Sequence, residues 1–252
     1  MLLACDVGNS SVKLAIYDKD KRIAFGLYPK KDFSCSTDIL SLTTKSNLRF
    51  DQFDAVYISS VVPQITEELK NYIETSFNIA PTIISNKSKL SITIDEKFQE
   101  EIGQDILVMS SYAYSKFNDE VLIISFGTAT VFAYVNKEGV LKGCAIAPGF
   151  KSFSTSLSEK STLLPSFTPE HKDKYLATNT IDAMSIGSFN GFIGMVNNIK
   201  DNIIKQEGIA PKVVICGGHS EKIKDYITNV DYQEADFVIS GLNHLYQTKW
   251  LD

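Results

Sequence analysis

The chain has 252 residues, of which 44% are hydrophobic and 22% charged, and its formal net charge is -5. This composition predicts a globular protein with a real core, and the net charge gives no electrostatic indication of DNA or RNA binding. The four cysteines form no CxxC pair and the three histidines lie far apart, so we expect free thiols and no zinc site. We expect no membrane span and no signal peptide, and hence a cytoplasmic protein.

The first hundred residues are predicted to begin with three short strands joined by tight turns, which form an antiparallel meander. Helices and strands then alternate, and Pro63 suits the first turn of a helix because proline lacks the N–H that would stay unpaired there. The predicted elements are strands at 2–5, 11–17 and 22–27, a helix near 38–46, a strand at 55–59, a helix over 63–77 and a strand at 81–85.

The same order of elements returns in the second half of the chain, without any repeat of sequence. Strands are predicted at 121–125, 129–135 and 140–147, then a long helix over 180–206, and then a strand at 212–216 that is followed by a helix. This order resembles the duplicated ribonuclease-H-like α/β fold of the actin-like ATPases. We therefore expect two domains, 1–115 and 116–252, with a central nucleotide cleft.

A candidate phosphate-binding loop follows the first strand. Gly8 permits a tight turn with backbone N–H groups close to a ligand, Asn9 and Ser10 add polar groups, and Lys13 lies within reach of a phosphate. Asp6 offers the hard oxygen atoms that Mg²⁺ prefers. The alternative is an ordinary hairpin turn.

A second candidate loop occupies the matching place in the second half, where Gly127 and Thr128 could contact phosphate. Two such turns at equivalent places favour phosphate binding over two plain turns. Gly217, at the end of a later apolar strand, could let an adenine ring lie against the backbone. The alternative there is a strand-to-helix turn, with His219 in the first turn of the helix.

Several motifs, taken in order, resemble those of the type III pantothenate kinases, a branch of the superfamily of acetate and sugar kinases, Hsp70 and actin. They cover nearly the whole chain and are strong as an ordered set. The motifs are residues 6–10, residues 58–63, Gly103-Gln104-Asp105, residues 126–130, residues 143–149, and Asn179-Thr180 with Gly187 and Gly191.

The resemblance implies ATP-dependent phosphorylation of pantothenate to phosphopantothenate, the first step of coenzyme A biosynthesis, with Mg²⁺ and a monovalent cation such as K⁺ or NH₄⁺. It implies that Asp105 is the base, that Gly103 and Thr180 bind substrate, and that the protein is a homodimer whose partner chain helps to bind pantothenate. From the residues alone, Asp105 could equally be a helix N-terminal acid and Thr180 a helix cap.

The chain departs from the family pattern at two charged positions. Ser125 stands where the family usually has an aspartate that helps to hold the monovalent cation, and a hydroxyl is the weaker ligand. Ile106 stands where an arginine contacts the acidic substrate. Two alternatives therefore stay open: a kinase of this fold that acts on another hydroxyl, and a non-catalytic nucleotide-binding or regulatory relative.

Overall fold

A computed structural model describes residues 1–95, 102–161 and 164–249. Contacts divide the chain into two compact units. The first comprises residues 1–118, 135–143 and 236–252, and the second comprises residues 119–134 and 144–235. Each unit groups contacting residues from separate parts of the chain, so the units do not test a single boundary along the sequence. The predicted domains, 1–115 and 116–252, therefore stay a prediction.

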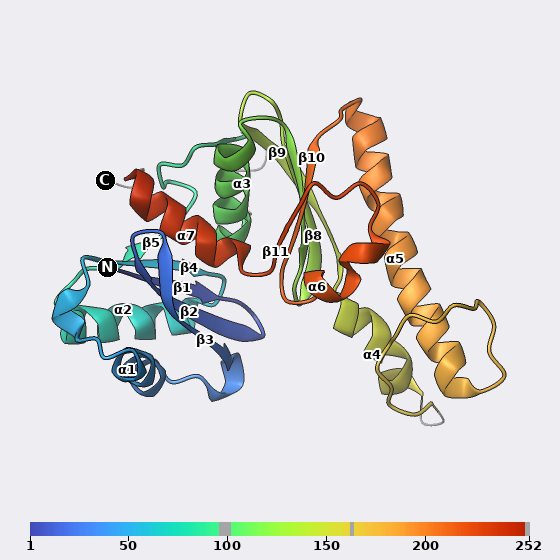
Figure 1. Cartoon of the computed structure of the whole chain (residues 1–252), viewed down its shortest axis with the longest axis horizontal. Helices are drawn as coiled ribbons and strands as arrows, with labels where there is room; N and C mark the ends of the chain where they lie inside the picture. Colours follow the sequence, from blue (N-terminus) through green and yellow to red (C-terminus); the bar gives the residue numbers. More distant parts are fainter. Residues whose placement is uncertain (96–101, 162–163, 250–252) are drawn as a thin grey trace. The chain divides into compact units, whose positions relative to one another are not determined.

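The first unit contains a five-stranded sheet in the order β3-β2-β1-β4-β5 (Figure 1). β1 pairs antiparallel with β2, and β2 pairs antiparallel with β3, which confirms the predicted meander. β1 also pairs in parallel with β4. The strands are β1 (Leu2–Val7), β2 (Ser11–Asp18), β3 (Lys21–Pro29), β4 (Ala55–Ser60) and β5 (Thr82–Ile83).

Helices pack on both faces of this sheet, with α1 and α2 on one side and α3 and α7 on the other (Figure 1). Pro63 is the first residue of α2, as predicted, and the left-handed Asn78 ends that helix. The elements are η1 (Lys30–Asp32), α1 (Cys35–Lys45), η2 (Phe50–Gln52), α2 (Pro63–Phe77), α3 (Gln104–Phe117) and α7 (Phe237–Thr248).

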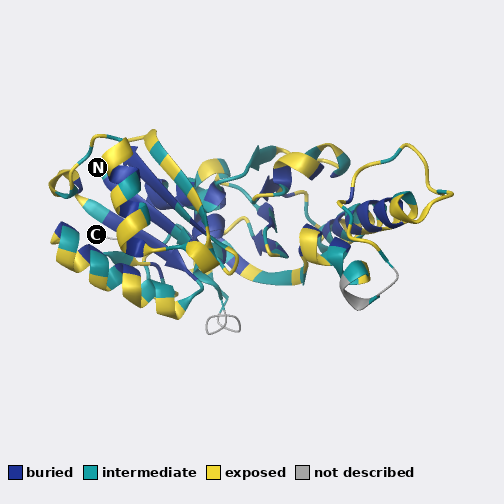
Figure 2. Cartoon of the chain, turned by 90° about the horizontal axis from the view of Figure 1, so that it is seen from below, coloured by how far each residue is buried: buried dark blue, intermediate teal, exposed yellow. Residues whose placement is uncertain are grey.

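Side chains along β1 alternate between the two faces, as the pleat requires. Leu3 and Cys5 belong to the core under α1 and α2, whereas Leu2 and Ala4 belong to the core under α3 and α7. Figure 2 shows these central strands as buried. By the same alternation, Asp6 points toward the face of α3 and α7.

The second sheet has the order β11-β10-β7-β8-β9-β6, with β10 parallel to β7. Large apolar residues on β7, β8 and β10 form a core with α4, α5 and α6. The elements are β6 (Thr93–Ile94), β7 (Val121–Phe126), β8 (Ala129–Val135), β9 (Val140–Pro148), α4 (Phe150–Lys160), α5 (Thr180–Glu207), β10 (Lys212–Cys216), α6 (Ser220–Ile223), η4 (Lys224–Tyr226) and β11 (Tyr232–Glu234). Within the described ranges, no helix is long and apolar enough to cross a membrane.

Two helices were not expected from the sequence, α4 and α7, and the helix after β10 is only one turn long. α7 carries a recognisable signal, since Phe237 is buried at its start and Ile239, Leu242 and Leu245 are buried at intervals of three residues. Asp236 stands just before them, where a helix N-cap residue is expected.

The long helix α5 buries one lysine completely. The side chain of Lys200 is 0% exposed, and its Nζ donates to the carbonyl oxygen of Thr228 at 2.8 Å and to its Oγ1 at 2.6 Å. Asp201 Oδ1 lies 3.0 Å from the same nitrogen. A buried ammonium needs such partners, because an unpaired charge in the core is costly.

Replacing Lys200 with methionine should lower the free energy of unfolding by about 1–3 kcal/mol, because the helix loses the hydrogen bonds of Lys200 to Thr228 and its ion pair with Asp201. Urea denaturation followed by circular dichroism measures the change. Lys205→Met, on an exposed position of the same helix, is the control and should stay within about 0.5 kcal/mol of the wild type. Equal effects of the two substitutions would contradict this account.

Candidate functional site

The first candidate loop is a tight turn between β1 and β2. The backbone N–H of Gly8 donates to the carbonyl oxygen of Ser11 at 2.9 Å, and that of Lys30 donates to the carbonyl oxygen of Ser10 at 2.9 Å. The side chains of Asn9 and Ser10 are exposed. The loop therefore has a fixed backbone and polar side chains that can meet a ligand.

Three predicted site residues come together beside this loop, in the first unit. Asp6 and Lys13 are paired residues of the antiparallel strands β1 and β2, so their side chains lie on one face. Burial raises the pKa of Asp6 to about 7, and the charges of Asp105 and Asp236 raise this pKa as well. Lys13 acts in the opposite direction and lowers it. The sequence brings these carboxylates together from strand β1 and from the starts of α3 and α7.

Asp105 occupies the first turn of α3, and Gly103 is the N-cap residue of that helix. Asp105 Oδ1 accepts a hydrogen bond from the backbone N–H of Ile106 at 2.9 Å. A Cβ atom at position 103 would come within 2.6 Å of the same oxygen, so glycine makes room for the carboxylate. Burial raises the pKa of Asp105, which makes it a better proton acceptor than an ordinary aspartate.

These carboxylates suit a magnesium ion that arrives with a nucleotide. No group of three or more His, Cys, Asp or Glu residues that could enclose a metal occurs in the ranges that the structure describes. Mg²⁺ is typically held by one or two carboxylates together with water and substrate phosphates. The buried, hard oxygen donors of Asp6 fit that manner of binding.

The second candidate loop, between β7 and β8, is held by close backbone packing. Gly127 N–H donates to the carbonyl oxygen of Ala129 at 3.0 Å, and Thr128 is exposed. A Cβ atom on Gly149, the N-cap residue of α4, would overlap the carbonyl oxygens of Gly127 and Thr128. Glycine at position 149 thus lets α4 begin directly against this loop, and Thr130 Oγ1 donates to the carbonyl oxygen of Pro148 at 3.1 Å.

Gly217 packs against the end of β7 in the same unit. Its φ angle is +90°, and a Cβ atom there would lie 2.6 Å from the carbonyl oxygen of Phe126. That oxygen also accepts the backbone N–H of His219 at 3.2 Å. Ser125 lies beside Cys216 across the β7–β10 pair. Gly127, Thr128, Ser125 and Gly217 are therefore parts of one local arrangement.

Thr180 is the exposed first residue of α5, and it is not the cap of that helix. The N-cap residue is Asn179, whose Oδ1 accepts the backbone N–H of Asp182 at 2.9 Å. This leaves the Thr180 side chain exposed instead of engaged in the helix start. Its predicted role in substrate binding stays a prediction.

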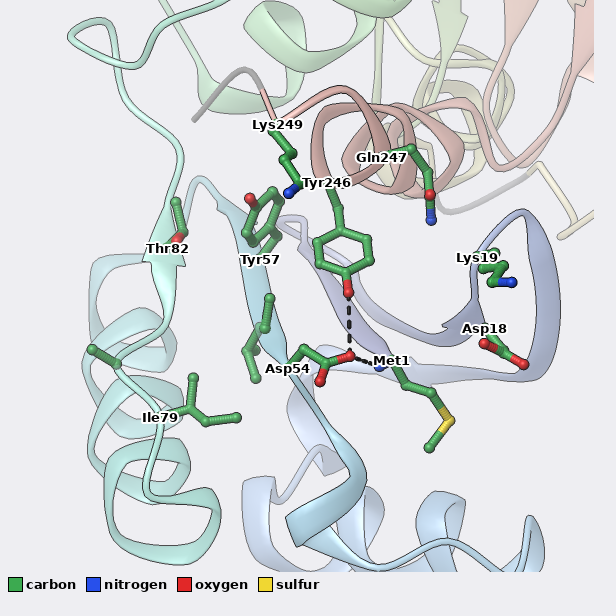
Figure 3. Close-up of a pocket in the computed structure, with 13 residues that line it drawn as sticks. Met1, Asp18, Lys19, Asp54, Tyr57, Ile79, Thr82, Tyr246, Gln247 and Lys249 are labelled. Carbon is green, nitrogen blue, oxygen red and sulfur yellow. Dashed lines mark hydrogen bonds and ion pairs between the residues drawn. The ribbon is translucent and has the colours of Figure 1, made fainter. Parts of the chain in front are cut away.

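A pocket of about 550 Å³ lies at the other end of β1, and no predicted site residue lines it (Figure 3). Its lining includes Met1, Asp54, Tyr57 and Tyr246. The Tyr246 hydroxyl donates to Asp54 Oδ2 at 3.3 Å. Pairing with the Met1 ammonium group holds the pKa of Asp54 below its ordinary value. The pocket is thus separate from the Asp6 group.

Gly217→Ala should lower the free energy of unfolding by about 2–4 kcal/mol, because a side chain would be strained at positive φ and would clash with Phe126. Thermal denaturation measures the effect. The neighbouring Gly218 is the matched control, since no atom lies within 4 Å of a Cβ placed there. Gly218→Ala should be nearly neutral, and a similar loss in both variants would contradict the packing argument.

Asp6→Asn should become more stable relative to the wild type as the pH rises. The folded wild type binds the Asp6 proton more tightly than the unfolded chain does, so this group's contribution to stability falls as the pH rises toward and through about 7. Asparagine has no proton to lose. The difference in melting temperature should therefore grow between about pH 5 and about pH 8. The exposed Asp18→Asn is the control, and a difference for Asp6→Asn that is independent of pH would contradict the buried carboxyl.

Comparison with known proteins identifies a family match and relatives of the chain. The sequence pattern of the type III pantothenate kinase family matches residues 2–202. The type III pantothenate kinase of Geobacter sulfurreducens is 31% identical in an alignment of 258 positions that covers 98% of each chain.

Two solved structures show a similar fold. The (R)-2-hydroxyglutaryl-CoA dehydratase component A of Acidaminococcus fermentans has a TM-score of 0.60 at 13% identity, and the match covers 100% of this chain and 99% of that one. The 2-hydroxyisocaproyl-CoA dehydratase activator of Clostridium difficile, solved with bound ADPNP, has a TM-score of 0.55 at 12% identity, over 99% and 95% of the chains. The predicted duplicated ribonuclease-H-like fold of the actin-like ATPases is thus confirmed. The family match over residues 2–202 and the 31% identity to the Geobacter sulfurreducens enzyme show that the chain belongs to the type III pantothenate kinase family.

Proposed function

We propose that this chain transfers the γ-phosphoryl group of ATP to the primary hydroxyl of pantothenate, the first step of coenzyme A biosynthesis. The observation that carries the proposal is the convergence of Asp6, Lys13 and Asp105 beside the β1–β2 turn, in a chain of this family. Phosphoryl transfer depends mainly on positioning and on charge neutralisation. A partly buried carboxylate pair next to a lysine and a glycine turn supplies the groups for both.

In this mechanism, Asp105 accepts the proton of the pantothenate hydroxyl while the hydroxyl oxygen attacks the γ-phosphorus. The new bond is from that oxygen to phosphorus, the bond from phosphorus to the bridging oxygen of ADP breaks, and ADP leaves. The raised pKa of Asp105 favours this proton transfer near neutral pH. Gly103, whose missing side chain makes room for the carboxylate, and the exposed Thr180 would contact pantothenate.

The nucleotide would be bound by both loops. Backbone and side-chain groups of Gly8, Asn9 and Ser10 would contact the phosphates, with Lys13 as a further cation. Gly127 and Thr128 would contact phosphates from the second loop, and the bare backbone at Gly217 would lie against the adenine. A magnesium ion held by Asp6 would neutralise charge on the transferring phosphoryl group.

The cation requirement is a further part of the proposal. Ser125 offers one hydroxyl and no charge, so it would form a weaker site for K⁺ or NH₄⁺ than an aspartate would. We therefore expect that any activation by K⁺ or NH₄⁺ needs a higher cation concentration than a site built on an aspartate would need.

The chain would act in the cytoplasm as a homodimer that assembles through its second unit. Five large apolar residues are exposed in that unit, and burial against a second copy of the chain would remove them from water. These residues are Ile146, Leu157, Tyr175, Leu176 and Ile181. Ile181 adjoins Thr180, so a partner chain on this surface would lie near the residue that is expected to contact pantothenate.

Asp105→Asn should lower kcat by about 10²- to 10⁴-fold, because the amide cannot accept the hydroxyl proton. The measurement is ATP-dependent formation of phosphopantothenate with Mg²⁺, with and without K⁺. The wild-type rate should fall as the pH drops through the raised pKa of Asp105, since the base is then protonated. Asp119→Asn is the control, because Asp119 Oδ1 accepts the next backbone N–H at 2.9 Å just as Asp105 does.

The alternatives predict different outcomes in the same assay. A folded wild-type chain that binds ATP but forms no phosphopantothenate with any cation would exclude the pantothenate proposal. Turnover with another alcohol would then indicate a kinase with a different acceptor. Nucleotide binding without any turnover would indicate a regulatory relative.

A further inference from the structure

Asp236 makes contacts that no sequence motif suggested. It is the N-cap residue of α7, yet its side chain caps no backbone N–H of that helix. Its Oδ1 lies 3.1 Å from Lys13 Nζ, and its Oδ2 accepts a hydrogen bond from Arg22 Nη1 at 2.9 Å. One carboxylate thus joins the start of α7 to strands β2 and β3.

Because its carboxylate binds Lys13 and Arg22, Asp236 does not make the capping hydrogen bond that would stabilise α7. An aspartate at an N-cap usually accepts a hydrogen bond from the second or third N–H of its helix. Here both oxygen atoms are turned to cations of the sheet instead. The side chains of Lys13 and Asp236 are 16% and 22% exposed, so water screens their attraction less than it would on an open surface.

Lys13 has a second carboxylate within reach. Asp6 is its direct partner in the antiparallel pair of β1 and β2, on the same face of the sheet. Directly opposite side chains lie about 5 Å apart at Cβ, a distance that a lysine side chain easily spans. In the described part of the chain, Lys13 forms an ion pair with Asp236, and Asp6 is affected by Lys13 through its charge.

We propose that Asp236 is a positioning residue that draws the Lys13 ammonium away from Asp6 and so leaves the Asp6 carboxylate available to a divalent cation. This inference rests on the proposed function, in which Asp6 holds the magnesium ion of the nucleotide. Without Asp236, Lys13 would turn to the facing carboxylate of Asp6 as an internal counter-ion. Mg²⁺ would then have to displace an ammonium group that is covalently part of the site.

Arg22 completes the arrangement. Because it binds the second oxygen of Asp236, it fixes the orientation of the carboxylate while Oδ1 faces Lys13. Arg22 also lies over the ring of Phe25, 4.8 Å from its centroid, which restricts the guanidinium. Its loss should loosen Asp236 without releasing Lys13.

The test is calorimetric titration of the purified full chain with ADP at increasing Mg²⁺, which gives the Mg²⁺ concentration for half-maximal binding. Asp236→Asn should raise that concentration by about fivefold, the scale of a partly shielded ion pair. Asparagine is as good an N-cap residue as aspartate, so α7 should remain folded. Asp236→Glu, which keeps the carboxylate, should return the midpoint toward the wild-type value.

The double variant Lys13→Met with Asp236→Asn separates this role from a merely structural one. With no ammonium to occupy Asp6, its Mg²⁺ midpoint should return to within about twofold of the wild type, even if ADP affinity at saturating Mg²⁺ is weaker. Arg22→Gln should likewise stay within about twofold. An unchanged midpoint in Asp236→Asn, or a double variant as impaired as Asp236→Asn, would overturn the proposal.

The outcome is distinguishable from failure of the proposed function. The titration uses ADP and requires no phosphoryl transfer, so a chain without pantothenate turnover can still give the predicted Mg²⁺ shifts. Wild-type ADP binding that does not depend on Mg²⁺ would overturn the positioning role, because Asp6 would then have no cation to receive.

Discussion

The burial of the first sheet on both faces is the constraint on which the Asp6 site depends. Residues of β1 alternate between two apolar cores, one under α1 and α2 and the other under α3 and α7. A carboxylate can be accommodated only where a strand ends and the apolar cover opens. Asp6 stands at that place, and the pairing of β1 with β2 sets Lys13 beside it. The starts of α3 and α7 then bring two further carboxylates to the same side of the sheet.

Placing these carboxylates close together lowers the stability of the folded chain, and a purely structural role would not explain that loss. Burial and the neighbouring charges of Asp105 and Asp236 all disfavour ionised Asp6, and Lys13 offsets them only in part. A divalent cation would relieve both the burial and the repulsion at once, because it interacts favourably with every carboxylate around it. The group is therefore better suited to a bound nucleotide with its metal than to an empty site, a balance typical of functional positions.

Most elements that position the site could be read from the sequence, because they depend on local pattern. Alternating apolar residues predicted the meander, Pro63 marked the start of α2, and the predicted strand at 212–216 is β10. The Asp236 contact could not be read, because Asp236 lies 214 residues from Arg22 and local pattern does not report such separations. Because α7 was not among the predicted elements, Asp236 was not recognised from the sequence as a helix N-cap residue. The roles of the site residues stay predictions, and what the structure adds is local geometry, such as the room that Gly103 leaves for the Asp105 carboxylate.

The two halves support their loops by different means, although their architecture is duplicated. Charge surrounds the first loop, whereas glycine packing surrounds the second, where Gly149 and Gly217 bring backbone against residues 126–128. The two departures from the family pattern are divided in the same way, with Ile106 in the first unit and Ser125 in the second. Ile106 is only 6% exposed and packs in the core, so a guanidinium pointing the same way would be buried without water. An isoleucine at this position adds to the apolar core of the first unit, so this side chain cannot pair with the acid group of pantothenate as an arginine would.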